Sequence, residues 1–163
     1  MTNPDSSHRH AATLILMGAT GDLAHSMLLP SLFALHAGNL LPPGFKLIGI
    51  ARRAMSADDF RAMAKEAVEK YLPRDRQNPS RLPAFLACLD YHGADLDDPD
   101  CLKPLRQALG PAAEKPLAVQ RSIAPRLFVK AIAALKQGGL AGEETRVAVE
   151  RPGSTGPKVS MRT

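Results

Sequence analysis

An apolar run that ends directly in a glycine-containing turn is the feature that most limits how this chain can fold. Residues 13–17 read TLILM, a run too short for a helix and suited to a strand buried on both faces. Residues 18–22, GATGD, follow at once, and residues 23–36 then place leucines at helical spacing. The order of strand, tight turn and helix predicts the first part of a βαβ unit.

The same alternation of strands and helices continues along most of the chain. Pro30 lies inside the first predicted helix and is expected to kink or restart it. Ser56 and Asp59 form a plausible capping box for the second helix. Further strands are expected at residues 46–51, 89–94, 117–119 (weak) and 145–150, and further helices at 57–71, 82–88, before 109 and at 125–136. This pattern predicts an α/β fold, doubly wound and Rossmann-like, with helices on both faces of a parallel sheet.

The length and the residue pattern predict one domain with short extensions. A chain of 163 residues is enough for one domain of ordinary size. Residues 1–12 are expected to be a flexible leader, residues 13–152 the folded domain, and residues 153–163 an unstructured tail without apolar periodicity.

Composition and charge exclude several classes of function. No apolar run approaches the ~20 residues that span a bilayer, so no membrane segment is expected. Residues 110–163 carry nine basic and four acidic side chains, but the basic ones are scattered and only Phe128 is interleaved, which argues against nucleic-acid binding. Cys88 and Cys101 lack metal-ligand spacing and are expected to be reduced thiols in the cytoplasm.

The turn at residues 18–22 is the candidate binding site. A dinucleotide pyrophosphate binds backbone N–H groups at a helix N-terminus, and glycines allow that close approach. Gly18 and Gly21 flank Thr20, whose hydroxyl adds a donor, although the spacing is not G-x-G-x-x-G. The alternative is an ordinary strand–helix turn in which Asp22 is the N-cap.

The end of the second predicted strand indicates which dinucleotide is preferred. Enzymes that prefer NAD usually place an acidic residue there, whereas this chain has Arg52 and Arg53. A guanidinium pairs well with a phosphate dianion, which favours the 2′-phosphate of NADP. The alternative is two surface arginines after a strand.

These segments together resemble the opening of glucose-6-phosphate dehydrogenases. The likeness rests on residues 18–24 (GATGDLA), 28–30 (LLP), 49–52 (GIAR), 95–99, 124–128 (APRLF) and 146–152 (RVAVERP). It covers roughly residues 12–152 in the right order. The resemblance implies NADP as cofactor and glucose 6-phosphate as substrate. The cofactor-binding positions it implies are Gly18, Ala19, Thr20, Gly21, Asp22, Leu23, Arg52, Asp95, Leu96 and Arg151.

The chain also departs from the family pattern. His25-Ser26-Met27 stands where the family has a basic run, and Arg151 replaces a lysine that contacts substrate and cofactor. Gln120 and Arg121 are awkward in a fourth strand that is usually hydrophobic.

The family's catalytic histidine and its α+β substrate domain have no counterpart before residue 163. We assign no catalytic residue and no metal ligand, because none of the five histidines lies in a matching segment; they are His8, His10, His25, His36 and His92. We therefore expect a truncated product that binds NADP without completing catalysis, with exposed apolar surface and an oligomeric state that the sequence does not define. The alternatives are a non-catalytic binding fragment and an unrelated nucleotide-binding or interaction module, although no P-loop motif is present.

Overall fold

The computed structural model describes residues 12–114, 117–141 and 146–149, and its elements follow the predicted alternation. The strands are β1 (Thr13–Met17), β2 (Lys46–Ala51), β3 (Leu89–Gly93), β4 (Leu117–Arg121) and β5 (Arg146–Val149). The α-helices are α1 (Leu29–Ala37), α2 (Ala57–Tyr71), α3 (Leu82–Ala87), α4 (Lys103–Leu109) and α5 (Phe128–Gln137). Short helical turns are η1 (Ala24–Leu28, a π-helix), η2 (Arg74–Arg76), η3 (Gly110–Glu114) and η4 (Pro125–Leu127).

The strands form one parallel sheet in the order β3-β2-β1-β4-β5. The first strand therefore lies at the centre, with β2 on one side and β4 on the other. This arrangement is the doubly wound, Rossmann-like α/β fold that the sequence predicts. In such sheets ligands bind outside the carboxyl ends of the strands where the strand order reverses, which here is between β1 and β4.

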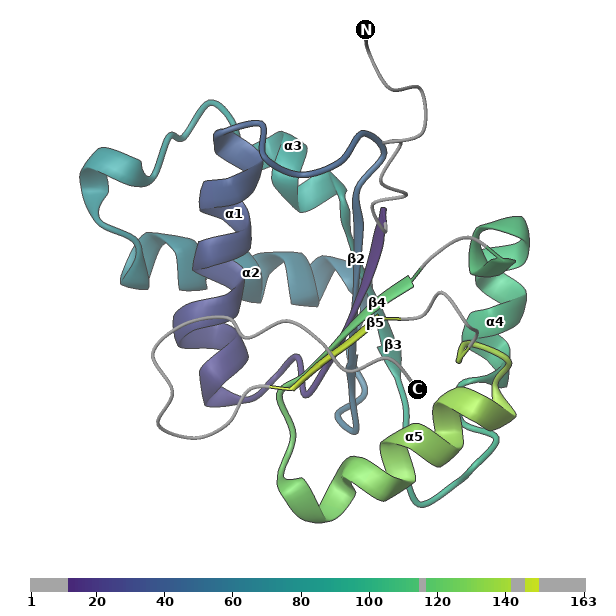
Figure 1. The fold of residues 1–163 in the computed structure, drawn as a ribbon. Coiled ribbons are helices and arrows are strands. Elements are labelled where there is room, and N and C mark those ends of the chain that lie inside the picture. Colours follow the sequence, from purple (N-terminus) through teal and green to yellow (C-terminus); the bar gives the residue numbers. More distant parts are fainter. Residues whose placement is uncertain (1–11, 115–116, 142–145, 150–163) are drawn as a thin grey trace, which may run out of the picture.

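Helices cover both faces of the sheet and bury two separate cores. Figure 1 shows α1, α2 and α3 on one side of the strands and α4 and α5 on the other. Alternate residues of β1 supply the two cores, because successive side chains of a strand point to opposite faces. Leu16 packs with Phe33 and Phe60 on the α1 and α2 side, whereas Ile15 and Met17 pack on the α4 and α5 side.

Local sequence signals account for the starts of two helices. The Ser56 Oγ accepts a hydrogen bond from the Asp59 N–H at 3.0 Å, so the predicted cap of α2 is confirmed. Pro30 lies in the first turn of α1, directly after the π-helical turn η1. The backbone stays helical from Asp22 through η1 into α1, so Pro30 lies where the hydrogen bonding changes from π-helical to α-helical, and the missing proline amide is accommodated at this change.

Two predicted boundaries were wrong. The strand expected at residues 117–119 continues to Arg121, because all five residues of β4 pair with β1, from Thr13 with Leu117 to Met17 with Arg121. The helix expected from residue 125 begins as the 3₁₀ turn η4 and becomes α-helical at Phe128.

The described residues include no helix that is both long and apolar enough to cross a membrane. Apolar side chains are nevertheless exposed on the outside of α5, where Val129 is 77% and Ile132 is 40% exposed. Exposed apolar side chains of this kind are common on folded proteins, so the expectation of an uncovered apolar surface stays a prediction.

Candidate functional site

The turn after β1 lies at the carboxyl edge of the sheet, between the ends of β2 and β4. The amides of Gly18 and Ala19 donate to the Ile50 carbonyl oxygen at 2.8 and 3.1 Å. On the other side, the Ser122 amide donates to the Met17 carbonyl oxygen at 2.8 Å. The turn is thus fastened to both neighbouring strands, at the position where a doubly wound sheet binds its ligand.

The geometry of this turn requires a glycine at position 18 and leaves little room for a side chain at position 21. Gly18 has a φ of 82°, and a Cβ there would lie 2.0 Å from the Ser122 carbonyl oxygen. A Cβ on Gly21 would lie 3.2 Å from the Gly18 carbonyl oxygen, which accepts a hydrogen bond from the Gly21 amide at 3.0 Å. The spacing of the two glycines therefore permits a turn that packs against the end of β4.

The first helical turn presents backbone donors at this edge. Helical conformation begins at Asp22, and the first helical hydrogen bond runs from the His25 amide to the Gly21 carbonyl oxygen at 3.1 Å. Gly21, and not Asp22, therefore occupies the cap position, so the alternative of an ordinary strand–helix turn was wrong in naming Asp22 as the N-cap. In the described part of the chain, the amides of Thr20, Asp22 and Leu23 donate no hydrogen bond. Such amides at the positive end of a helix are suited to an anion.

The predicted residues of the turn differ in what they present. The Ala19 side chain is fully buried in the core beside Phe60, so only its backbone faces the edge. Thr20 and Leu23 are half-buried, and Asp22 is exposed. The turn can therefore offer a ligand backbone amides, one hydroxyl and limited apolar surface.

A glycine in β2 makes room for this arrangement. A Cβ on Gly49 would lie 2.6 Å from Phe60 Cζ and 2.9 Å from Ala19 Cβ. Phe60 of α2 thus lies directly against β2 and under the turn. The sequence reasoning did not assign Gly49 this role, although a glycine inside a strand pattern signals close approach of another group.

Arg52 directly follows β2, and its side chain contacts the segment after β3. Its Nε is 3.9 Å from Asp95 Oδ1, and its Nη2 is 3.5 Å from Asp97 Oδ2. Asp95 also accepts a hydrogen bond from the Asp97 amide at 3.0 Å, which orders this turn. Leu96 packs against the core on the α4 and α5 side. The structure therefore brings Arg52 close to Asp95 and Asp97, whereas Leu96 of the same segment faces the core.

Lys130 of α5 joins the same group by an ion pair with Asp97 Oδ1. The pKa of the Asp97 carboxyl is lowered, first by the hydrogen bond from Lys130 and then by the charge of Lys130. Partial desolvation opposes this shift, and the charge of Arg52 adds to it. The carboxylate is therefore ionised at neutral pH. Sequence reasoning missed both residues. Asp97 belongs to the noted acidic segment, whereas no local signal identifies Lys130.

Arg121 places an unusual charge at the carboxyl end of β4. The residue is only 8% exposed, and its guanidinium lies 4.4 Å from the centre of the Phe128 ring. Its Nε is buried and has no hydrogen-bond partner among the residues that the structure describes. Burial lowers the pKa of this guanidinium from its ordinary value. Stacking on Phe128 compensates part of the cost of burying the charge.

The remaining candidates lie elsewhere. Arg151 falls outside the described residues, as do His8 and His10. Within the described residues, no group of three or more His, Cys, Asp or Glu side chains is arranged to hold a metal ion.

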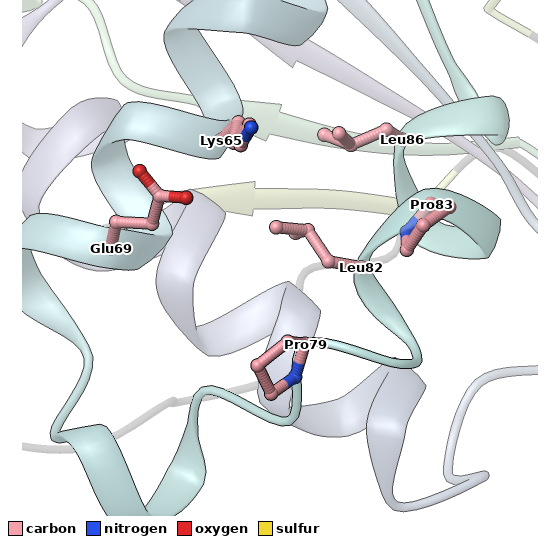
Figure 2. A pocket seen from close by; sticks show the side chains of 6 residues that line it. All are labelled: Lys65, Glu69, Pro79, Leu82, Pro83 and Leu86. Carbon is pink, nitrogen blue, oxygen red and sulfur yellow. The ribbon is translucent and has the colours of Figure 1, made fainter.

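An open pocket of about 330 Å³ lies between α2 and the segment leading through α3. Figure 2 shows its lining residues, which are Lys65, Glu69, Pro79, Leu82, Pro83 and Leu86. Because α3 leads into the start of β3, this pocket lies toward the amino ends of the strands. It is therefore separate from the turn after β1.

Comparison with known proteins finds a matching family model and similar curated proteins. The family model for the NAD-binding domain of glucose-6-phosphate dehydrogenase matches residues 15–159. The glucose-6-phosphate 1-dehydrogenase of Zymomonas mobilis is 42% identical over 141 residues, which make up 86% of this chain and 29% of that protein.

Solved structures show the same fold. Glucose-6-phosphate 1-dehydrogenase from Mycobacterium avium superposes with a TM-score of 0.76 at 26% identity, over 86% of this chain and 29% of that one. A glucose-6-phosphate dehydrogenase in complex with glucose 6-phosphate gives 0.73 at 24% identity, over 86% of this chain and 30% of that one, which shows the fold alone. The chain thus spans less than a third of the length of these relatives.

Proposed function

Because the chain belongs to the family of glucose-6-phosphate dehydrogenase NAD-binding domains, we propose that its residues 13–152 form a domain that binds NADP. The observation that carries the proposal is the set of amides at Thr20, Asp22 and Leu23 that donate no hydrogen bond among the described residues, together with the cation of Arg52 after the neighbouring strand β2. The amides suit a pyrophosphate, and the guanidinium suits a 2′-phosphate.

The proposed contacts follow the order of the dinucleotide. The amides of Gly18 and Ala19 are already hydrogen-bonded to β2. We therefore assign the pyrophosphate to the amides of Thr20, Asp22 and Leu23 and to the Thr20 hydroxyl. Arg52 takes the 2′-phosphate, and Asp95 and Leu96 lie on the adenine side. Arg151 is proposed to replace the family's lysine at the nicotinamide end, with the charge retained but a different shape.

For the whole protein we propose the reaction of the family, in which NADP oxidises glucose 6-phosphate to 6-phosphogluconolactone in the cytoplasm, as the first step of the pentose phosphate pathway. The cofactor would supply the hydride acceptor. We assign the general base and the sugar-phosphate site to no residue of this chain, whose proposed contribution is binding and orientation of the cofactor.

The test is a fluorescence titration of the chain with NADPH and with NADH. We expect saturable binding that is tighter for NADPH. Arg52→Ala should weaken NADPH binding by roughly tenfold, because a charge-assisted hydrogen bond to the 2′-phosphate is lost. Gly21→Val should abolish binding of both, because a side chain there meets the Gly18 carbonyl oxygen.

Arg53→Ala is the matched control, since it removes an adjacent guanidinium whose side chain is also exposed. Equal losses in Arg52→Ala and Arg53→Ala would refute the assignment of Arg52. No binding of either dinucleotide by the folded chain would refute the cofactor domain and favour the alternative, a module without nucleotide affinity. Binding without dehydrogenase activity would fit the non-catalytic alternative.

A further inference from the structure

One carboxylate, Asp97, holds two cations that come from separate parts of the fold. Arg52 follows β2 and contacts Asp97 Oδ2 at 3.5 Å, and Lys130 comes from α5 and contacts Oδ1. The three side chains are about half to three-quarters exposed, so an incoming ligand can reach them. The two cations are thus already directed at a single anion beside the end of β2.

The charges of this group balance when it is empty. Arg52 and Lys130 are positive, and Asp95 and Asp97 are negative. An anion that replaced the Asp97 carboxylate between the cations would leave an ionised carboxylate close by. A singly charged or neutral group gains little from such an exchange, whereas a phosphate dianion gains more because it carries more charge and more acceptor oxygens.

We propose that Lys130 is a second cation for the 2′-phosphate and that Asp97 occupies this position when the cofactor is absent. The inference rests on the proposed function and deepens it. Asp97 keeps Arg52 and Lys130 in place but competes with the phosphate for them. Lys130 and Asp97 together therefore set how strongly the domain prefers NADP over NAD. Lys130 acts only on the phosphorylated cofactor, because NAD has a hydroxyl at that position.

The competition predicts opposite effects for the two residues. Lys130→Ala removes a phosphate ligand and should weaken NADPH binding by roughly threefold to tenfold. Asp97→Asn removes the competing charge and should strengthen NADPH binding by roughly threefold. Both should leave NADH binding within about twofold, and both effects should shrink at high ionic strength.

A second ion pair on the same side of the fold supplies matched controls. Lys103 Nζ lies 2.8 Å from Asp100 Oδ1, and these side chains are exposed to a similar degree, at 52% and 56%. Lys103→Ala and Asp100→Asn therefore change the net charge equally and remove a comparable pair. They should alter the NADPH-to-NADH affinity ratio much less than the changes at Lys130 and Asp97.

The experiment is a titration of the full chain and the four variants with NADPH and NADH, with thermal denaturation as a check on folding. The inference is supported if the NADPH-to-NADH affinity ratio falls in Lys130→Ala and rises in Asp97→Asn. Ratios equal to those of the controls, or equal loss of both cofactors, overturn it and leave the proposed function intact if Arg52→Ala still weakens NADPH. No binding by the unmodified chain overturns both.

Discussion

Replacing Gly18 by alanine tests the close approach of the first turn to β4. Gly18 has a φ of 82°, which a residue with a Cβ rarely adopts. The added methyl would also lie 2.0 Å from the Ser122 carbonyl oxygen and 2.7 Å from its carbonyl carbon. These are backbone atoms, and the Ser122 amide donates a hydrogen bond to the Met17 carbonyl oxygen, so they have little freedom to move.

A second glycine separates the two causes of destabilisation. Gly44 has a similar φ of 73°, but a Cβ there meets nothing within 4 Å. Gly44→Ala should therefore cost only the backbone term, about 1–2 kcal/mol of the free energy of unfolding. Gly18→Ala should cost the same term and an overpacking term of about 1–3 kcal/mol.

The assay is urea denaturation of the chain and both variants, followed by circular dichroism. We expect Gly18→Ala to lose at least about 1 kcal/mol more than Gly44→Ala. It should also lose NADPH affinity, because the amides of Thr20 and Asp22 move with the turn. Equal destabilisation of the two variants would show that the turn and β4 are not in close contact in solution, and the proposed site geometry would then be wrong.

Two further substitutions test single features of the fold by the same method. Ser56→Ala should lose about 1 kcal/mol of the free energy of unfolding, because the Asp59 amide loses its hydrogen-bond acceptor. The control is Ser80→Ala, whose hydroxyl donates to the exposed Asn78 side chain. Similar losses in the two variants would contradict the reasoning. Arg121→Met should gain about 1 kcal/mol, because a buried guanidinium with an unpartnered Nε is removed. A loss of stability in Arg121→Met would show that its stacking on Phe128 outweighs the cost of burial.

The sequence predicts the central strands well because their signal is local. Residues 13–17 and 46–51 are apolar on both faces, and their predicted bounds match β1 and β2. β4 lacks such a signal at its end, where Gln120 and Arg121 are polar. The strand continues there because β1 provides hydrogen-bond partners on one side and Phe128 covers the guanidinium, and both are tertiary effects.

The candidate site divides in the same way. The turn and Arg52 follow strands directly, so their place at the carboxyl edge could be predicted from the order of elements. Lys130 is 33 residues from Asp97 in the chain, and the pair forms only because α5 crosses back over the sheet. No pattern within one segment of sequence indicates such a contact.

Glycine spacing by itself also leaves the function of the turn open. Gly18 is required by the packing of the turn against the end of β4, and Gly21 lies close to the Gly18 carbonyl oxygen, whether or not a ligand binds. The amides of Gly18 and Ala19, which the motif places at the pyrophosphate, are already bonded to Ile50. Cofactor binding must therefore depend on the amides that make no hydrogen bond within the turn, those of Thr20, Asp22 and Leu23. It must also depend on the cations of Arg52 and Lys130. A variant that keeps the turn but loses those cations should fold normally and lose its preference for the phosphorylated cofactor.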